Sequence, residues 1–513
     1  MTALPDAFPK PPARLSRADL AYGATVFALT LLSALPFWLT DLLPMMDYPP
    51  FLTFVRAFQD YRDPSSPFHG TYTLGWPLSP LLLPLLVMRL LAAVTSIELA
   101  GKLLLTLYAI ALPAASIHLL RVLRRDRWCV LLVFPLVHSY WVSGGFFAFA
   151  TAPPLVVLGL AFAVRWLDRP SPRLGAALAA VATALFLWHA LAFAQLLLDF
   201  TLLWALWRAP GRRARWTALL PAAPSLALFA LWMATMVLAS PSGGRAPGPV
   251  AAWPPFLENA GQLLEFVGVL LPISTAYVIL FALLVLAGAA ATPARPHEAP
   301  DSPSPTARYH VPNPFAVLAL ANVACYLLLP SYCLGVEGIN NRHPWMAALL
   351  FTFAWSLPAR PAVKAGLLAS TAIGSGLLLL HLCERFMAFH EETVGASRLI
   401  DRLSRGQTLL APLDAWGATT TFPVKPLRSL QEIATVRHGG LPNHSFAGYG
   451  INIVQYVGGR NPMPGLGQNW LSHPELARFD YVLLRSPSAA LLAHERLELV
   501  ARDGRWALFA VRR

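Results

Sequence analysis

The sequence predicts a polytopic α-helical membrane protein with about eleven spans and a C-terminal extracytoplasmic α/β domain. Three observations lead to this fold class. Of the 513 residues, 56% are hydrophobic and only 13% are charged, whereas soluble chains carry about 25% charged residues. Apolar runs of membrane-spanning length recur from Ala21 to Cys383. Beyond residue 384, short segments typical of strands replace these runs.

The positions of lysine and arginine predict the orientation of the chain. They gather in the polar N-terminus and in alternate loops such as "RVLRRDR", "RAPGRRAR" and "PARPAVK", and basic loops stay in the cytoplasm. We therefore expect residues 1–19 in the cytoplasm, residues 20–383 as a multi-pass membrane domain, and residues 384–513 outside the cytoplasm. The net charge of +13 follows from this bias, and since no nucleic-acid-binding motif accompanies it, no nucleic-acid partner is expected.

The spans follow from the apolar runs and the loop charges. The segment 76–96 is long enough to cross, but Arg89 would then lie in hydrocarbon at a cost of about 3 kcal/mol. We therefore expect residues 41–97 to form one outer loop with an interfacial helix. The predicted spans are 20–41, 99–120, 128–142, 148–167, 174–188, 190–207, 216–239, 263–289, 314–330, 344–357 and 363–383.

The C-terminal 130 or so residues are enough for one small domain. The segments "GQTLLAPL", "FDYVLLR" and "LELVARDGRWALFAVRR" have the composition of strands. The last one alternates around Asp503-Gly504, a turn signal that predicts a hairpin.

Several classes of enzyme are disfavoured by missing motifs. The chain contains no Walker loop, no strand-borne G-x-G-x-x-G, no H-E-x-x-H and no zinc-binding Cys/His pattern. This argues against an ATPase, a nucleotide-sugar Rossmann enzyme and a zinc protease. An enzyme whose substrate is a lipid stays open.

The predicted outer face collects acids, cations and an apolar wall. The first outer loop begins with "MMDYPPF", which places Asp47 where the chain leaves the membrane, and continues with Arg56. Residues 142–147 read "VSGGFF", and residues 331–343 read "SYCLGVEGINNRH", which ends with Arg342 and His343. A carboxylate can accept a proton from an attacking hydroxyl, and an arginine can bind a departing phosphate through two hydrogen bonds. This set of groups suits transfer from a lipid phosphate.

The layout of residues 20–383 resembles the GT-C superfamily of membrane glycosyltransferases, in its bacterial mannosyltransferase-like branch. In that branch the first outer loop often reads Asp-Tyr-Pro-Asn-His, the second reads Gly-Phe-Leu-Asn, a histidine follows in a later span, and an arginine opens a late span. The matching positions are Asp47-Tyr48-Pro49, Gly145-Phe146, His189 and Arg342. The chain departs from the pattern at Phe51 and Ala148, which stand in place of the histidine and the asparagine.

The resemblance implies an inverting transfer of a sugar from a polyprenyl-phosphate donor, at the outer face of the bacterial inner membrane, to a glycan, lipid or protein acceptor. Asp47 would act as base, Arg342 as phosphate clamp and His189 as a pocket residue. Four neighbours in the outer loops are further candidates for substrate contacts: Tyr48, Arg56, Glu337 and Asn341. The family sometimes uses a divalent metal, but the 142–147 loop lacks the second acid that such members carry, so no metal ligand is assigned.

Two other classes of function remain open. Phe51, Ala148 and the missing acid favour a catalytically silent relative that binds a lipid-linked glycan. A transporter could use Asp199 and His189 as a proton path, because intramembrane acids are functional by default. The chain has no internal repeat of the kind that many transporters carry, and the large outer domain also counts against transport.

Overall fold

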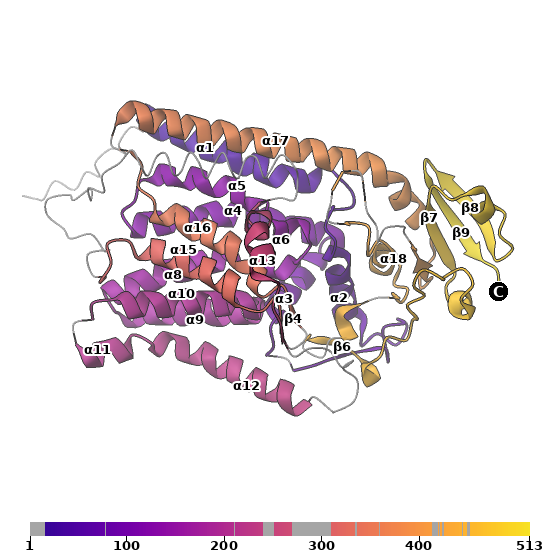
Figure 1. The fold of residues 1–513 in the computed structure, drawn as a ribbon. Helices are drawn as coiled ribbons and strands as arrows, with labels where there is room; N and C mark the ends of the chain where they lie inside the picture. The colour runs from indigo at the N-terminus through magenta and orange to yellow at the C-terminus, as the bar shows by residue number, and fades with distance from the viewer. Residues whose placement is uncertain are drawn as a thin grey trace, which may run out of the picture.

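A computed structural model describes residues 16–76, 78–209, 211–239, 251–268, 309–333, 336–358, 360–412, 419, 421–422, 425–443, 445–448 and 452–513. Most of the predicted span 263–289 lies outside these residues. The described part is a long helical bundle with a small β-sheet at one end (Figure 1).

The bundle is built from apolar helices that pack side by side. Five helical segments are long and apolar enough to cross a membrane in the described part of the chain: Arg17–Trp38, Ile97–Val122, Phe147–Asp168, Arg212–Thr235 and Pro361–Ile400. This finding identifies a multi-pass membrane protein, while the count of about eleven spans stays a prediction. The main helices are α1 (Arg17–Ala34), α4 (Ile97–Val122), α8 (Pro153–Asp168), α9 (Pro172–Trp188), α10 (Ala190–Leu206), α12 (Ala223–Ala239), α15 (Pro314–Leu328), α16 (His343–Ala354) and α17 (Pro361–Ile400).

The predicted span 128–142 is wrong as a single helix. Its residues form a 3-10 helix, Arg127–Val133, and two short helices, α5 (Phe134–Val137) and α6 (Tyr140–Ser143). The chain becomes extended at His138, whose Nε2 lies 2.8 Å from the carbonyl oxygen of Ser33. A partner from α1 therefore stabilises a break that periodicity alone does not reveal.

The first outer loop contains two helices, α2 (Tyr48–Asp60) and α3 (Leu82–Ala92). With 11 residues, α3 is about 17 Å long, which is too short for a hydrocarbon core of about 30 Å. It packs against α4 and α2. Whether the segment 76–96 lies at the interface stays a prediction.

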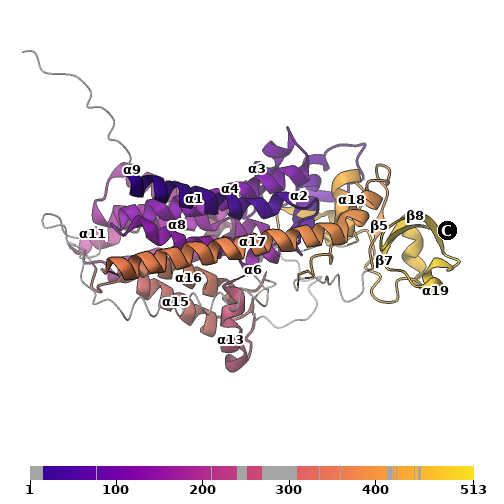
Figure 2. The same cartoon turned by 90° about the horizontal axis from the view of Figure 1, so that it is seen from above.

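The C-terminal part begins without a break in α17, so the boundary predicted at residue 384 falls inside a helix of 40 residues. Figure 2 shows α17 running along the bundle to the outer sheet. That sheet has the order β5-β7-β9-β8, formed by Leu409–Leu410, Tyr481–Arg485, Trp506–Val511 and Leu497–Asp503. The predicted hairpin is present as β8 and β9, with Gly504 at a φ of 57° in its turn.

The C-terminal part docks on the first outer loop. Helix α18 (Gln431–His438) packs on α2, and strand β6 (Val454–Tyr456) pairs with β1 (Tyr72–Leu74). Arg437 of α18 donates to both carboxylate oxygens of Glu98, at 2.7 and 3.0 Å. The helix that follows Asp47 is therefore fixed by both the bundle and the C-terminal part of the chain.

Candidate functional site

Asp47 lies directly before the first turn of α2. The helix begins with Tyr48-Pro49-Pro50, and prolines are tolerated there because the first N–H groups of a helix have no partner within it. The Asp47 side chain is partly exposed and makes no capping bond to α2. The two prolines thus explain where α2 starts, and that start sets the position of the carboxylate.

A close backbone contact joins Asp47 to the second outer loop. The Asp47 N–H donates to the carbonyl oxygen of Gly144, at 3.1 Å. Gly145 has a φ of 77°, and a Cβ at this position would lie 2.5 Å from the Asp47 nitrogen and 2.6 Å from the Tyr48 nitrogen. Only glycine allows both the left-handed conformation and this approach. The sequence motifs at Asp47 and Gly145 are therefore in direct contact.

Arg342 occupies a buried aromatic cage. Its guanidinium carbon lies 5.0, 5.7 and 4.9 Å from the ring centroids of Trp141, Phe146 and Phe149. The residue is only 7% exposed. Cation–π contacts stabilise a desolvated guanidinium by about 2 kcal/mol or more. The residues that follow the glycine pair therefore form part of the wall around the predicted phosphate clamp.

Backbone carbonyls orient the same guanidinium. Its Nη1 donates to the carbonyl oxygens of Glu337 and Gly338, at 2.9 and 2.5 Å, while Nε has no hydrogen-bond partner in the described part of the chain. The strands Ala251–Ala252, Tyr332–Cys333 and Val336–Glu337 form a small sheet that holds this loop. Burial lowers the pKa of Arg342 to about 9, so the side chain stays charged at neutral pH.

Tyr140 connects the two sides of the site, and sequence reasoning missed it. Its hydroxyl lies within electrostatic range of Asp47, Arg342 and Glu265. Its ring packs edge-on against Trp141 and Phe266. Tyr140 follows the break at His138 and immediately precedes the segment "WVSGG". This position next to the glycine motif could have identified it as a site residue.

His189 separates α9 from α10 and faces the cage. Its Nδ1 accepts the N–H of Leu191 at 3.2 Å, which caps α10 and leaves the ring hydrogen on Nε2. The ring lies 5.3 Å from Phe149, centroid to centroid, and within electrostatic range of Arg342. The structure thus brings the predicted pocket histidine to the same aromatic group as the predicted clamp.

Tyr48 and Arg56 have structural contacts. The Tyr48 hydroxyl donates to the carbonyl oxygen of Glu98 at 3.3 Å and fits against Gly101, where a Cβ would lie 1.9 Å from it. Arg56 forms an ion pair with Asp60 at 2.7 Å and lies near Gly439 of the outer domain. Contacts of Tyr48 and Arg56 with substrate stay predictions.

The Glu337 and Asn341 side chains are not the groups that hold Arg342. Glu337 contributes its carbonyl oxygen, and its side chain is exposed. The neighbour of Asn341, Asn340, is fully buried and donates to the carbonyl oxygen of Tyr326 at 3.1 Å. The backbone of this loop therefore holds Arg342, and contacts of the Glu337 and Asn341 side chains with substrate stay predictions.

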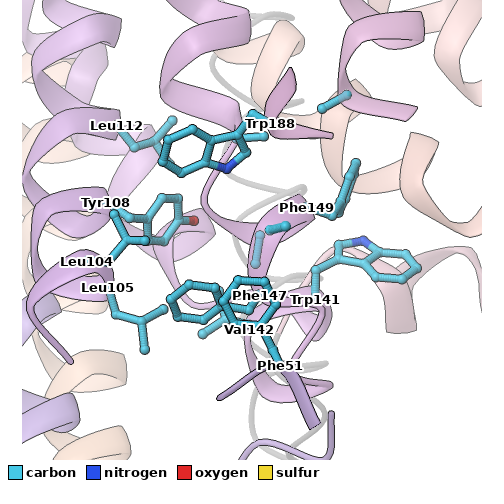
Figure 3. Packing of buried hydrophobic residues seen from close by; sticks show 14 of the residues in the cluster. Phe51, Leu104, Leu105, Tyr108, Leu112, Trp141, Val142, Phe147, Phe149 and Trp188 are labelled. Carbon is cyan, nitrogen blue, oxygen red and sulfur yellow. The ribbon is translucent and has the colours of Figure 1, made fainter. Parts of the chain in front are cut away.

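The floor beneath Asp47 is aromatic. Phe51, at the position of the family histidine, stacks on Phe147 with centroids 4.6 Å apart. Phe147 also contacts Tyr48, and Phe149 packs edge-on against Trp141. Figure 3 shows Phe51, Phe147, Phe149 and Trp141 in one buried group. The departure at Phe51 thus replaces a polar group with a packed ring.

The donor groups near Asp47 do not fit a divalent metal. Within the described part of the chain, no three His, Cys, Asp or Glu side chains are close enough to share an ion. The loop in contact with Asp47 offers Ser143, two glycines and aromatic rings, and hard cations prefer several oxygen ligands, carboxylates above all. No step of the chemistry below is therefore assigned to a metal.

The fold of the whole chain is similar to that of a solved transferase. ArnT from Cupriavidus metallidurans bound to undecaprenyl phosphate superposes with a TM-score of 0.54 and 14% identity, over 96% of this chain and 98% of ArnT. The chain has the fold of a GT-C glycosyltransferase. The apo state of ArnT gives the same TM-score, identity and coverage. No family model and no curated protein matches the sequence.

A second solved structure, the arabinofuranosyltransferase AftD from Mycobacteria, aligns with 97% of this chain and 40% of its own length, at 16% identity and a TM-score of 0.49. The match to ArnT confirms, at the level of fold, the GT-C resemblance that the short motifs indicated. It also extends that resemblance through the C-terminal part, which the motifs do not cover.

Proposed function

We propose that this protein is a glycosyltransferase that takes a sugar from a polyprenyl-phosphate donor at the outer face of a bacterial inner membrane. The observation that carries the proposal is the contact at Gly145, which joins Asp47 to the loop that walls Arg342. A partly exposed acid and a buried, charged guanidinium then lie at one end of the bundle, with Tyr140 in electrostatic range of both. ArnT, whose fold is similar, was solved with undecaprenyl phosphate bound.

In the proposed reaction, an acceptor hydroxyl attacks the anomeric carbon of the donor sugar. The new C–O bond forms as the bond between that carbon and the phosphate oxygen breaks, and its electron pair leaves with the polyprenyl phosphate. Asp47 takes the proton of the hydroxyl. Arg342 stabilises the negative charge that grows on the phosphate, and its aromatic surroundings exclude water that would weaken this attraction.

The test compares two acids of the first outer loop in full-length protein. Asp47→Asn removes the base without changing the size of the side chain, and general-base catalysis contributes about 100- to 10,000-fold. We expect at least a 100-fold loss of sugar transfer in membranes that contain a lipid-linked donor pool. Asp41→Asn, which changes an exposed acid six positions earlier, should transfer at the parent rate. Equal rates for all three proteins would refute the catalytic role of Asp47.

One specific observation favours a second candidate function, a silent protein that binds lipid-linked glycan. Phe51 fills a family histidine position with a buried, stacked ring, and the loop at Gly145 has no acid. Such a protein would bind undecaprenyl phosphate, and Arg342→Gln would weaken that binding, but no transfer would occur. If the parent protein binds undecaprenyl phosphate but transfers no sugar, the second candidate function is correct.

A further inference from the structure

A buried polar network lies next to the candidate site and has no role in the reaction described above. It consists of Gln195 and Asp199 on α10, Asn322 on α15 and His343 at the start of α16. They are 5%, 0%, 0% and 9% exposed. Polar groups buried in an apolar bundle are costly unless they are hydrogen-bonded, so a group of four calls for a reason.

The hydrogen bonds of this network fix the orientation of every member. Asn322 Nδ2 donates to the carbonyl oxygen of Leu318 at 3.0 Å and to Asp199 Oδ1 at 3.1 Å. Because the Leu318 carbonyl oxygen can only accept a hydrogen bond, the Asn322 amide group must point its nitrogen toward it and cannot be turned over. Asn322 Oδ1 therefore faces His343 Nδ1 at 2.8 Å and Gln195 Nε2 at 2.7 Å. It follows that His343 Nδ1 carries a hydrogen.

Asp199 is the acceptor at the far end of this chain. Its Oδ2 accepts from Gln195 Nε2 at 3.0 Å, and its Oδ1 accepts from Asn322. The acid thus fixes both amides, and the amide of Asn322 fixes the imidazole of His343. The contacts of the acid lead to His343 and not to His189, whose Nδ1 is taken by Leu191.

His343 follows Arg342 directly, at the point where α16 begins. The imidazole therefore anchors the backbone from which the guanidinium enters the cage. Contacts with rings and carbonyl oxygens restrict the guanidinium of Arg342. The buried network restricts the backbone of Arg342 through its neighbour His343. Loss of the anchor would let the helix start shift while the cage itself stays intact.

We propose that Asp199 is a positioning residue that acts through Asn322 and His343 to hold Arg342 where it binds the phosphate of a polyprenyl-phosphate ligand. The inference rests on the proposed function, because it assigns Arg342 to that phosphate. The inference explains the buried acid Asp199 by its effect on Arg342, without the proton path that a transporter would require.

The first experiment measures the binding of undecaprenyl phosphate to full-length protein in detergent, together with the thermal midpoint. Asp199→Asn keeps the shape but sets an N–H against an amide donor, Asn322 Nδ2 or Gln195 Nε2. We expect about a ten-fold weaker affinity with a midpoint near that of the parent. In an Arg342→Gln background the same substitution should have no further effect, because the group that it positions is gone. Ser116→Ala, which alters a buried hydroxyl of α4 bonded to Leu112, is the control and should bind like the parent.

Two further variants cover the case in which Asp199→Asn does not fold. His343→Phe cuts the network at its other end and leaves both bonds of Asp199 intact, so it should lose affinity to the same extent. Asp199→Asn combined with Asn322→Asp restores a donor opposite an acceptor but sets the new carboxylate against the Leu318 carbonyl, so it should regain part of the lost affinity.

The outcomes separate the inference from the function on which it rests. Parent affinity in Asp199→Asn or His343→Phe, or an equal further loss in the Arg342→Gln background, would overturn the positioning role alone. Equal binding by the parent and by Arg342→Gln would instead overturn the phosphate clamp and, with it, the proposed function.

Discussion

The two halves of the candidate site are held in different ways. Asp47 is placed by backbone: a helix start at two prolines and a contact that only glycine permits at Gly145. Arg342 is placed by side chains and carbonyls: three aromatic rings, the oxygens of Glu337 and Gly338, and a neighbour tied into a buried network. One methyl group added at Gly145 should therefore displace Asp47. Because several independent contacts hold Arg342, losing any one of them should weaken its function by a smaller amount.

Gly145→Ala should have the largest effect, because it attacks the backbone half. The added Cβ would overlap the Asp47 nitrogen in a residue whose φ is 77°, so the two outer loops must separate. We expect a loss of about 3 kcal/mol in unfolding free energy and loss of transfer, measured by thermal unfolding and a transfer assay.

The matched control for that change is Gly70→Ala in the first outer loop. Gly70 also has a positive φ, of 74°, but nothing lies within 4 Å of its Cβ position. Gly70→Ala should lower the unfolding free energy only by the strain of a left-handed alanine, about 1 kcal/mol, and should leave sugar transfer intact. Equal effects at the two glycines would show that strain, and not the contact with Asp47, explains the result.

Phe149→Leu tests the side-chain half and should have an intermediate effect. It removes one of the three rings over Arg342 and the ring against His189 while keeping an apolar side chain. We expect about a five-fold loss of undecaprenyl phosphate affinity, or about 1 kcal/mol. Phe315→Leu, which changes a buried phenylalanine packed on Phe353, should bind like the parent; if it loses as much, the cage is not the cause.

Tyr48→Phe should have the smallest effect and sharpens the comparison. Burial raises the pKa of Tyr48 well above its usual value, so the hydroxyl keeps its proton and donates to Glu98. Losing this bond should cost about 1 kcal/mol of unfolding free energy, without a change in ligand affinity. A selective loss of affinity would restore the substrate contact predicted from the sequence.

The sequence predicted the membrane class, the outer hairpin and the GT-C resemblance because each rests on local signals. Apolar length, an Asp503-Gly504 turn and short loop motifs can be recognised without tertiary contacts. The break at His138 could not be predicted, since a carbonyl of α1 stabilises it. The uninterrupted course of α17 through residue 384 was also missed, because polar residues beyond it find partners in the C-terminal part. Arg385 donates to the carbonyl oxygen of Thr421, and Glu392 forms an ion pair with Arg485.

For the site, the sequence proposed Asp47, Arg342 and His189, whose roles stay predictions, but it could not predict what holds Arg342 in place. Carbonyl groups of Glu337 and Gly338 hold the guanidinium. Because every residue has a backbone carbonyl, the sequence does not show which of them accept hydrogen bonds. Tyr140 and the network at Asp199 depend on which helices become neighbours, which no single segment encodes.

The C-terminal part is joined to the bundle covalently through α17 and non-covalently through α18 and the β6–β1 strand pair. Helix α17 enters it without a hinge, and α18 is tied to α2 and α4 by packing and by the pair Arg437–Glu98. Over the length of α17, about 60 Å, a tilt of about 5° at the membrane end moves the far end by about 5 Å. Such a tilt would shear α18 across the helix that begins at Asp47. A tilt of α17 within the bundle and a movement of α18 over α2 are thereby coupled mechanically.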